Sequence, residues 1–285
     1  MKAARQPFLK ESKTRATKYG EHVHWDLWGP ATVKSLNGNL FVAARINDVT
    51  RETKLYFQTK KSQMVDSYKL DEAHIEAQSG NRIKVVCSDR GGEFQTQALI
   101  NHQNQRGTIR EFMVHDSPPQ NGVAERGMRT RAERARALLL GSGLPHFLWQ
   151  EAMLHATWLQ NRTPAQALEG KTPYKMLNKK VPNLAGIQDF GATAYMKDLK
   201  AGKLDAHVKV GCFVGYDSES KGYRIYWLWD TPIWIQRLSK KHYMVPMPRN
   251  GKKHWTMRSI SFKSLEPGLW RTYQLVKQPY HAAKS

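Results

Sequence analysis

The chain has 285 residues, 40% of them hydrophobic and nine of them tryptophan, so it is long enough to bury a sizeable core. No stretch approaches the ~18 consecutive apolar residues of a membrane span, and the first residues lack the apolar segment of a secretory signal. Cys87 and Cys212 lie far apart and form no Cys/His ligand spacing, which favours free intracellular thiols over a disulfide.

The basic residues are concentrated at the two ends of the chain. Lysine and arginine total 45 against 24 acidic residues, a net charge of +21. Residues 1–20 carry six basic residues and one acid, residues 237–285 carry eleven and one, and the 216 residues between them carry only +6. Such arms bind nucleic-acid phosphates, with an affinity that falls steeply with salt. An anionic membrane surface is the second candidate partner, and two solvated tails without a partner are the alternative.

The first part of the chain predicts three strands joined by short turns. Residues 21–30, 40–48 and 54–60 have the alternation and the β-forming side chains of strands. The first run ends in the turn residues Gly29-Pro30, and Asn37-Gly38 precedes the second run. Short connections of this kind predict an antiparallel meander.

Helices and strands then alternate. In order, the pattern predicts a helix at 61–78 closed by Ser79-Gly80, a strand at 83–89, a helix at 93–106, a strand at 108–114, a helix at 123–140 ended by Gly141, and a helix at 146–162. The order β-β-β-α-β-α-β-α-α indicates an α/β fold in which helices cover a mixed sheet, the arrangement of an RNase H-like domain.

The pattern changes after about residue 165. Segments 171–177 and 180–184 are expected to be connectors, and short strands and turns follow from Phe190 to about Met247. The tryptophans of this β-region are expected to form its own core rather than a base-stacking surface: Trp227, Trp229 and Trp234. The expected organisation is a basic arm (1–20), an RNase H-like core (21–165), a linker (166–189), a small β-domain (190–247) and a basic tail (248–285).

Three acidic residues fall where this topology would bring them together. Asp26 lies in the first strand, Asp89 ends the strand at 83–89, and Glu125 begins the first long helix. Clustered carboxylates suit two Mg²⁺ or Mn²⁺ ions about 3.5–4 Å apart, which stabilise the charge that develops in phosphodiester hydrolysis or transfer. A surface charge or a helix cap is the alternative for each acid taken alone. The pattern therefore predicts Asp26, Asp89 and Glu125 as catalytic metal ligands.

Several polar residues adjoin these acids. His22, His24 and Asp26 share one face of a strand, where a polar strand edge is favoured over a histidine-containing metal site. Arg129 and Arg136 lie on the Glu125 face of their helix and are candidate phosphate ligands, with a solvated basic face as the alternative. Residues 115–122 form a loop that is expected to close on substrate, so Gln120 and Asn121 are further candidate nucleic-acid contacts.

Long motifs carry a resemblance to a known family. HWDLWGP (24–30), VVCSDRGGEF (85–94) and SPPQNGVAERGMRT (117–130) resemble the integrase region of Ty1/copia-type retrotransposon polyproteins. The resemblance extends over residues 3–245 through SGLPHFLWQEA, LQNRTP, KTPYKML, KLD and GCFVGYDSESKGYRIY.

The resemblance implies a polynucleotidyl transferase whose Asp26, Asp89 and Glu125 bind two Mg²⁺ or Mn²⁺ ions. The implied reactions are 3′-end processing of element DNA and its strand transfer into a target, by in-line attack of water and then of a 3′-hydroxyl, without a covalent intermediate. The segment from Phe190 resembles the SH3-like domain that follows the core. The implied partners are DNA, with RNA as a second candidate, and further copies of the chain.

The chain also departs from the family pattern. KAARQPF matches only the segment after the family's His/Cys zinc module, and no CxxC is present, so no zinc is expected in this chain. Protease and reverse transcriptase segments are missing, so a fragment is expected, and the alternatives are an inactive nucleic-acid-binding relic or a nuclease of the same fold. The expected location is the nucleus, or a cytoplasmic particle, with Lys240-Lys241 and Lys252-Lys253 as weak import signals.

Overall fold

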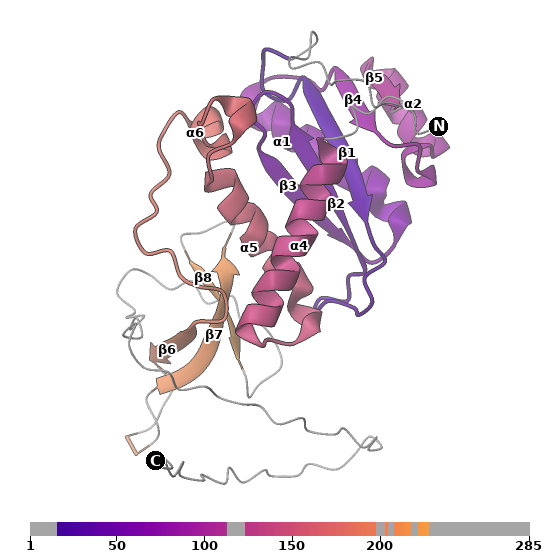
Figure 1. The fold of residues 1–285 in the computed structure, drawn as a ribbon. Coiled ribbons are helices and arrows are strands. Elements are labelled where there is room, and N and C mark those ends of the chain that lie inside the picture. The colour runs from indigo at the N-terminus through magenta and orange to yellow at the C-terminus, as the bar shows by residue number, and fades with distance from the viewer. Residues whose placement is uncertain (1–15, 113–122, 198–202, 205–207, 218–221, 228–285) are drawn as a thin grey trace, which may run out of the picture. The chain divides into compact units, whose positions relative to one another are not determined.

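The computed structural model describes residues 16–112, 123–197, 203–204, 208–217 and 222–227, all within the compact unit Met1–Val245 (Figure 1). These residues form two sheets, with strand orders β3-β2-β1-β4-β5 and β6-β7-β8. The strands are β1 His22–Trp28, β2 Phe41–Asn47, β3 Thr53–Gln58, β4 Val85–Ser88, β5 Ile109–Phe112, β6 Thr193–Lys197, β7 Val208–Tyr216 and β8 Tyr223–Trp227. The helices are α1 Met64–Ser79, α2 Gln97–Arg106, α4 Ala124–Ser142, α5 Trp149–Arg162 and α6 Pro173–Asn178.

The first sheet is mixed, as the sequence predicts. Strands β1, β2 and β3 pair antiparallel, whereas β4 and β5 extend the sheet in parallel from β1. The parallel strands need crossover connections, which α1 and α2 supply. Strand order and helix placement together give the RNase H-like fold expected for this part of the chain.

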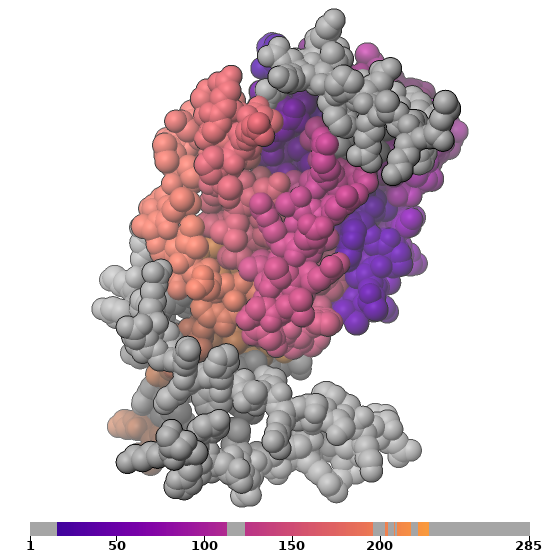
Figure 2. All heavy atoms as spheres, in the orientation of Figure 1, coloured from indigo at the N-terminus to yellow at the C-terminus, as the bar shows by residue number. Residues whose placement is uncertain are grey.

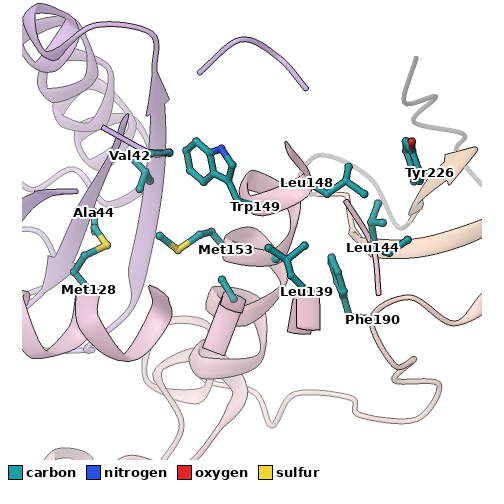
Figure 3. Close-up of a cluster of buried hydrophobic side chains, with 14 residues drawn as sticks. Val42, Ala44, Met128, Leu139, Leu144, Leu148, Trp149, Met153, Phe190 and Tyr226 are labelled. Carbon is teal, nitrogen blue, oxygen red and sulfur yellow. The ribbon is translucent and has the colours of Figure 1, made fainter. Parts of the chain in front are cut away.

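The two faces of this sheet are buried against different helices. On β2, Ala43 packs with Met64, Tyr68 and Ile75 of α1. Its neighbours Val42 and Ala44 point to the opposite face, because side chains alternate along a strand, and pack with residues of α4 and α5. Figure 3 shows Met128 of α4 beside Ala44. Asp26 pairs with Ala44, so its side chain belongs to the α4 face of the sheet.

The end of helix α4 differs from the sequence expectation. Helix α4 continues through Gly141 and ends at Gly143, whose backbone is left-handed (φ 67°) and whose N–H donates to the Leu139 carbonyl at 3.0 Å. An interior glycine costs a helix only about 1 kcal/mol, which the burial of Leu139 and Leu144 offsets.

Residues 173–178, expected to be part of a connector, form helix α6. The Thr172 hydroxyl caps its first turn by accepting the Lys175 N–H at 3.0 Å. Pro173 occupies the first helical position, where no backbone donor is needed. The expectation of a connector at 171–177 missed this helix, although Thr-Pro is a helix-start signal.

The second sheet is antiparallel and has its own small core of Ala194, Phe213, Ile225 and Trp227. Trp227 therefore packs inside the sheet, as expected, whereas Trp229 and Trp234 lie outside the described residues. Gly211 permits the close pairing of β7 with β8, because a Cβ there would lie 2.6 Å from Ile225 Cγ2.

The second sheet is joined to the first through α5. Glu151 accepts two hydrogen bonds from Arg224 of β8, at 2.6 and 2.7 Å, and its side chain is almost fully buried. One apolar cluster runs from Val42 past Met153 to Phe190 and Tyr226 (Figure 3). Cys87 and Cys212 are both free thiols. Within the described part of the chain, no helix has the length and apolar character needed to cross a bilayer.

Candidate active site

Asp26 and Asp89 occupy equivalent register positions on the neighbouring parallel strands β1 and β4. Asp26 is the fifth residue of β1, and Asp89 directly follows β4. His24 lies opposite Cys87 in the β1–β4 pairing, so each aspartate stands two residues beyond a paired position. Because adjacent strands are about 4.8 Å apart, this register brings the two carboxylates to the same edge of the sheet.

Glu125 approaches this edge from the helix that covers it. It is the second residue of α4, whose buried residue Met128 packs with Ala44, the partner of Asp26 in β1–β2. The Glu125 side chain is exposed, and its Oε1 accepts a hydrogen bond from Arg129 Nη2 at 3.0 Å. Figure 2 shows the magenta surface of α4 running across this side of the molecule beside the indigo strands.

The pKa of Asp26 shows that the three acids influence one another. Burial raises the pKa of Asp26 to about 6, and repulsion from the Asp89 carboxylate and then from Glu125 adds to the increase. A hydrogen bond involving the Leu27 backbone and the charge of Arg131 act in the opposite direction. Negative charge at this edge is therefore only partly compensated by the chain, and a bound cation would stabilise it.

A tight turn fixes the Asp89 carboxylate. The Gly91 N–H donates to Asp89 Oδ1 at 3.0 Å. A Cβ at Gly91 would lie 2.8 Å from Glu93 Oε1 and 3.0 Å from Asp89 Oδ1, so a larger residue there would have to displace the Glu93 carboxylate. Glu93 is thus a fourth acid beside the site, with Lys61 Nζ 3.8 Å from its Oε2. Sequence reasoning missed Glu93, although it stands only four residues after Asp89.

Arg131 lies beneath the site rather than on the solvated helix face. It is 1% exposed, and its Nη2 donates a hydrogen bond to the Thr53 hydroxyl. Its Nε and Nη1 are buried, and no residue that the structure describes offers them a hydrogen bond. Burial lowers the pKa of Arg131 to about 10, although the Asp26 carboxylate favours the charged form.

The predicted nucleic-acid residues fall into two groups. Arg129 and Arg136 are exposed on α4, and Arg129 is paired with Glu125. Gln120 and Asn121 lie outside the described residues.

Comparison with known proteins shows which polyproteins this chain is similar to. A model of the retroviral polymerase SH3-like domain matches residues 192–237. The Retrovirus-related Pol polyprotein from transposon TNT 1-94 of Nicotiana tabacum is 32% identical over 224 residues, which are 78% of this chain. The corresponding polyproteins from transposons RE2 and RE1 of Arabidopsis thaliana are each 28% identical, over 78% and 83% of this chain. The chain corresponds to the integrase-core and SH3-like region of copia-type Pol polyproteins. It spans 17%, 15% and 16% of the length of these three relatives.

Solved retroviral integrases are also similar to this copia-type region. A simian T-cell lymphotropic virus intasome in complex with PP2A regulatory subunit B56 gamma gives a TM-score of 0.48 at 14% identity, covering 82% of each chain. The trimeric HTLV-2 integrase catalytic core domain in complex with magnesium gives 0.41 at 16% identity, covering 55% of this chain and 95% of that one. The BIV integrase catalytic core gives 0.40 at 16% identity, covering 56% and 95%.

Proposed function

We propose that this chain carries out metal-dependent polynucleotidyl transfer, namely 3′-end processing of element DNA and its strand transfer into target DNA. The observation that carries the proposal is the β1–β4 register, which sets Asp26 and Asp89 level at one edge of the sheet. Glu125 begins the helix that packs over this edge. Its partners are element and target DNA and further copies of the chain, and it acts in the nucleus.

The donor set fits Mg²⁺ or Mn²⁺. Asp26, Asp89 and Glu125 offer carboxylate oxygens, the ligands that both ions prefer. Burial, and then the like charges of Asp89 and Glu125, raise the pKa of Asp26, and two divalent cations would offset those like charges. When bound, such ions stabilise charge on the attacking and leaving oxygens of a phosphodiester.

The remaining residues of the site orient the acids or bind the substrate. The Gly91 N–H donates to the Asp89 carboxylate and so orients it. Arg129, paired with Glu125 in this structure, becomes available for a phosphate when Glu125 turns to a cation. Arg136 lies exposed farther along α4 and binds the DNA backbone in the same way, as do Gln120 and Asn121.

A strand-transfer assay on labelled element-end DNA with Mg²⁺ or Mn²⁺ tests the proposal. The parent chain should give joined products longer than the substrate. Asp89→Asn should lower the rate by at least about 100-fold, because it removes a charge from the cation site. Asp66→Asn, on an exposed acid of α1, is the matched control and should leave the rate unchanged.

Each other outcome has a distinct meaning. Shortened products without joined products would indicate that the chain is a nuclease and does not carry out strand transfer. The absence of product from the parent chain, together with salt-sensitive DNA binding by the parent and by Asp89→Asn, would indicate an inactive nucleic-acid-binding protein. Equal activity of Asp89→Asn and the parent would refute the proposed catalytic role of the three acids.

A further inference from the structure

A second group of metal-binding side chains lies in the same sheet, beside the three acids. His22 and His24 of β1 and Cys87 of β4 each offer one ligand atom, and these atoms all lie within 4.8 Å of one another. None of the three takes part in the chemistry proposed above. The cluster combines nitrogen and sulfur donors, whereas the acids offer only oxygen.

The strand register explains why these residues meet. His24 lies opposite Cys87 in the parallel β1–β4 pair, and Cys87 lies opposite Glu111 in the parallel β4–β5 pair. Paired residues point to the same face of the sheet, so His24, Cys87 and Glu111 form a row across β1, β4 and β5. His22 stands two residues before His24 on the same face, with the two rings stacked at 4.8 Å.

Two histidine nitrogens of this cluster are buried without a hydrogen-bond partner among the described residues. The His24 side chain is only 7% exposed, and its Nε2 lies 3.2 Å from Asp48 Oδ1. Its Nδ1 is buried and has no hydrogen-bond partner in the described part of the chain, and neither has Nε2 of His22. Buried polar atoms in native proteins nearly always have partners, so two unsatisfied nitrogens beside a buried thiol need an explanation.

We propose that His22, His24, Cys87 and Glu111 form a tetrahedral zinc site that fastens β1 to β4 and β5. Zinc takes histidine nitrogen, cysteine sulfur and carboxylate oxygen at about 2.0–2.3 Å, which separates tetrahedral ligands by roughly 3.3–3.8 Å. His22 Nε2 already lies 3.7 Å from Glu111 Oε2. The ligand atoms of His22, His24 and Cys87 lie within 4.8 Å of one another, so the widest of these pairs must close by about 1 Å, a distance that side-chain rotation can supply.

Asp48 orients the ring that supplies the buried ligand. A histidine bound to a metal commonly donates its other ring N–H to a carboxylate. Here His24 Nε2 donates to Asp48 Oδ1, which leaves Nδ1 for the metal. Binding converts the Cys87 thiol to a thiolate and releases its proton to solvent.

The zinc site is separate from the acids but positioned to support them. Asp26 and Asp89 stand two residues beyond His24 and Cys87 on the same two strands. A metal link between those strands would hold the two carboxylates level, without taking part in transfer. The site revises the sequence expectation that this chain holds no zinc. It does not depend on the proposed catalytic function.

Cobalt is the probe, because a cobalt–thiolate bond absorbs in the near ultraviolet and tetrahedral cobalt absorbs in the visible. The chelator-treated full chain should bind one equivalent of Co²⁺ with both absorptions, and one equivalent of Zn²⁺ should abolish them. Cys212→Ser, at the other cysteine, should keep the spectrum, and Cys87→Ser should lose the thiolate absorption. Asp89→Asn should also keep it, because that substitution alters only the carboxylate site.

A second variant covers the case in which Cys87→Ser does not fold. His22→Gln, at a side chain only 13% exposed at the start of β1, should keep the thiolate absorption but weaken Co²⁺ binding at least about tenfold. Zn²⁺ should raise the melting temperature of the parent and of Cys212→Ser more than that of His22→Gln. A folded parent without thiolate absorption at one equivalent of Co²⁺ would overturn the proposal. So would an absorption that depends on Cys212 instead of Cys87.

Discussion

Arg131 is a buried cation with incomplete hydrogen bonding, and its replacement should stabilise the protein. Two of its guanidinium nitrogens have no hydrogen-bond partner within the ranges that the structure describes, and burial lowers its pKa to about 10. Arg131→Met keeps a similar volume and removes the desolvated charge, so it should raise the free energy of unfolding by about 1–3 kcal/mol. Urea denaturation measures the change. The control Arg134→Met, exposed on the same helix, should stay within about 0.5 kcal/mol of the parent. A loss of stability in Arg131→Met would show that its charge is needed by Asp26.

His155 makes stability depend on pH. It lies on α5 among Phe190, Phe213 and Tyr216, where burial lowers its pKa to about 4 although the Asp189 carboxylate opposes this. The unfolded chain takes up the proton near pH 6.5, whereas the folded chain does not until about pH 4. The stabilisation is therefore complete above pH 6.5 and is lost as pH falls towards 4, by up to about 3 kcal/mol.

Urea denaturation between pH 7 and pH 4 measures this contribution. His155→Leu should have a shallower decline of unfolding free energy across that range than the parent, because the titrating group is gone. The exposed residue His146 gives the matched control, His146→Leu, which should decline like the parent. Identical slopes for His155→Leu and the parent would contradict the assignment.

At the scale of elements, much of the fold was predictable because its signals are local. The acids were placed by strand ends and a helix start, which alternation and glycine punctuation reveal. The burial of Arg131 also had a signal: Ala124, Met128, Arg131, Ala135 and Leu139 form the buried stripe of α4 at helical spacing. The regular recurrence of arginine along that helix obscured it.

Other features depend on long-range pairing and could not be read from the sequence. His22 and His24 share a strand face at any register, but Cys87 joins them only because β4 pairs parallel with β1. Glu111 joins the row through a further parallel pairing. The position of Glu93 beside Asp89 depends on the Gly91 turn, whose backbone geometry a sequence pattern does not specify.

At the scale of the whole molecule, one ion pair ties the SH3-like sheet to the integrase core. Glu151 on α5 and Arg224 on β8 are 2% and 12% exposed and share two hydrogen bonds. Glu151→Ala should lower the free energy of unfolding by about 3–5 kcal/mol, because it leaves the Arg224 charge buried without its partner. Chemical denaturation measures the loss. The double variant Glu151→Leu/Arg224→Met should recover most of it, and a loss below about 1 kcal/mol in Glu151→Ala would contradict the role of the pair.

Under the proposed function, the charge of the whole molecule predicts how its DNA binding depends on salt. Residues 246–285 carry eight lysines and arginines and one glutamate, a net +7 of the total +21, and they lie beyond the matched SH3-like segment at 192–237. Each phosphate neutralised by a protein cation contributes about −0.9 to the slope of log affinity against log salt. Deleting residues 246–285 should therefore make that slope shallower by up to about 7, while thermal melting of the remaining chain stays unchanged. Binding of a labelled duplex at a series of salt concentrations measures both slopes.

An unchanged slope would assign DNA binding to the basic face of α4 and the N-terminal arm. A shallower slope with unchanged strand transfer would limit the tail to capturing DNA, leaving Asp26, Asp89 and Glu125 to act on it.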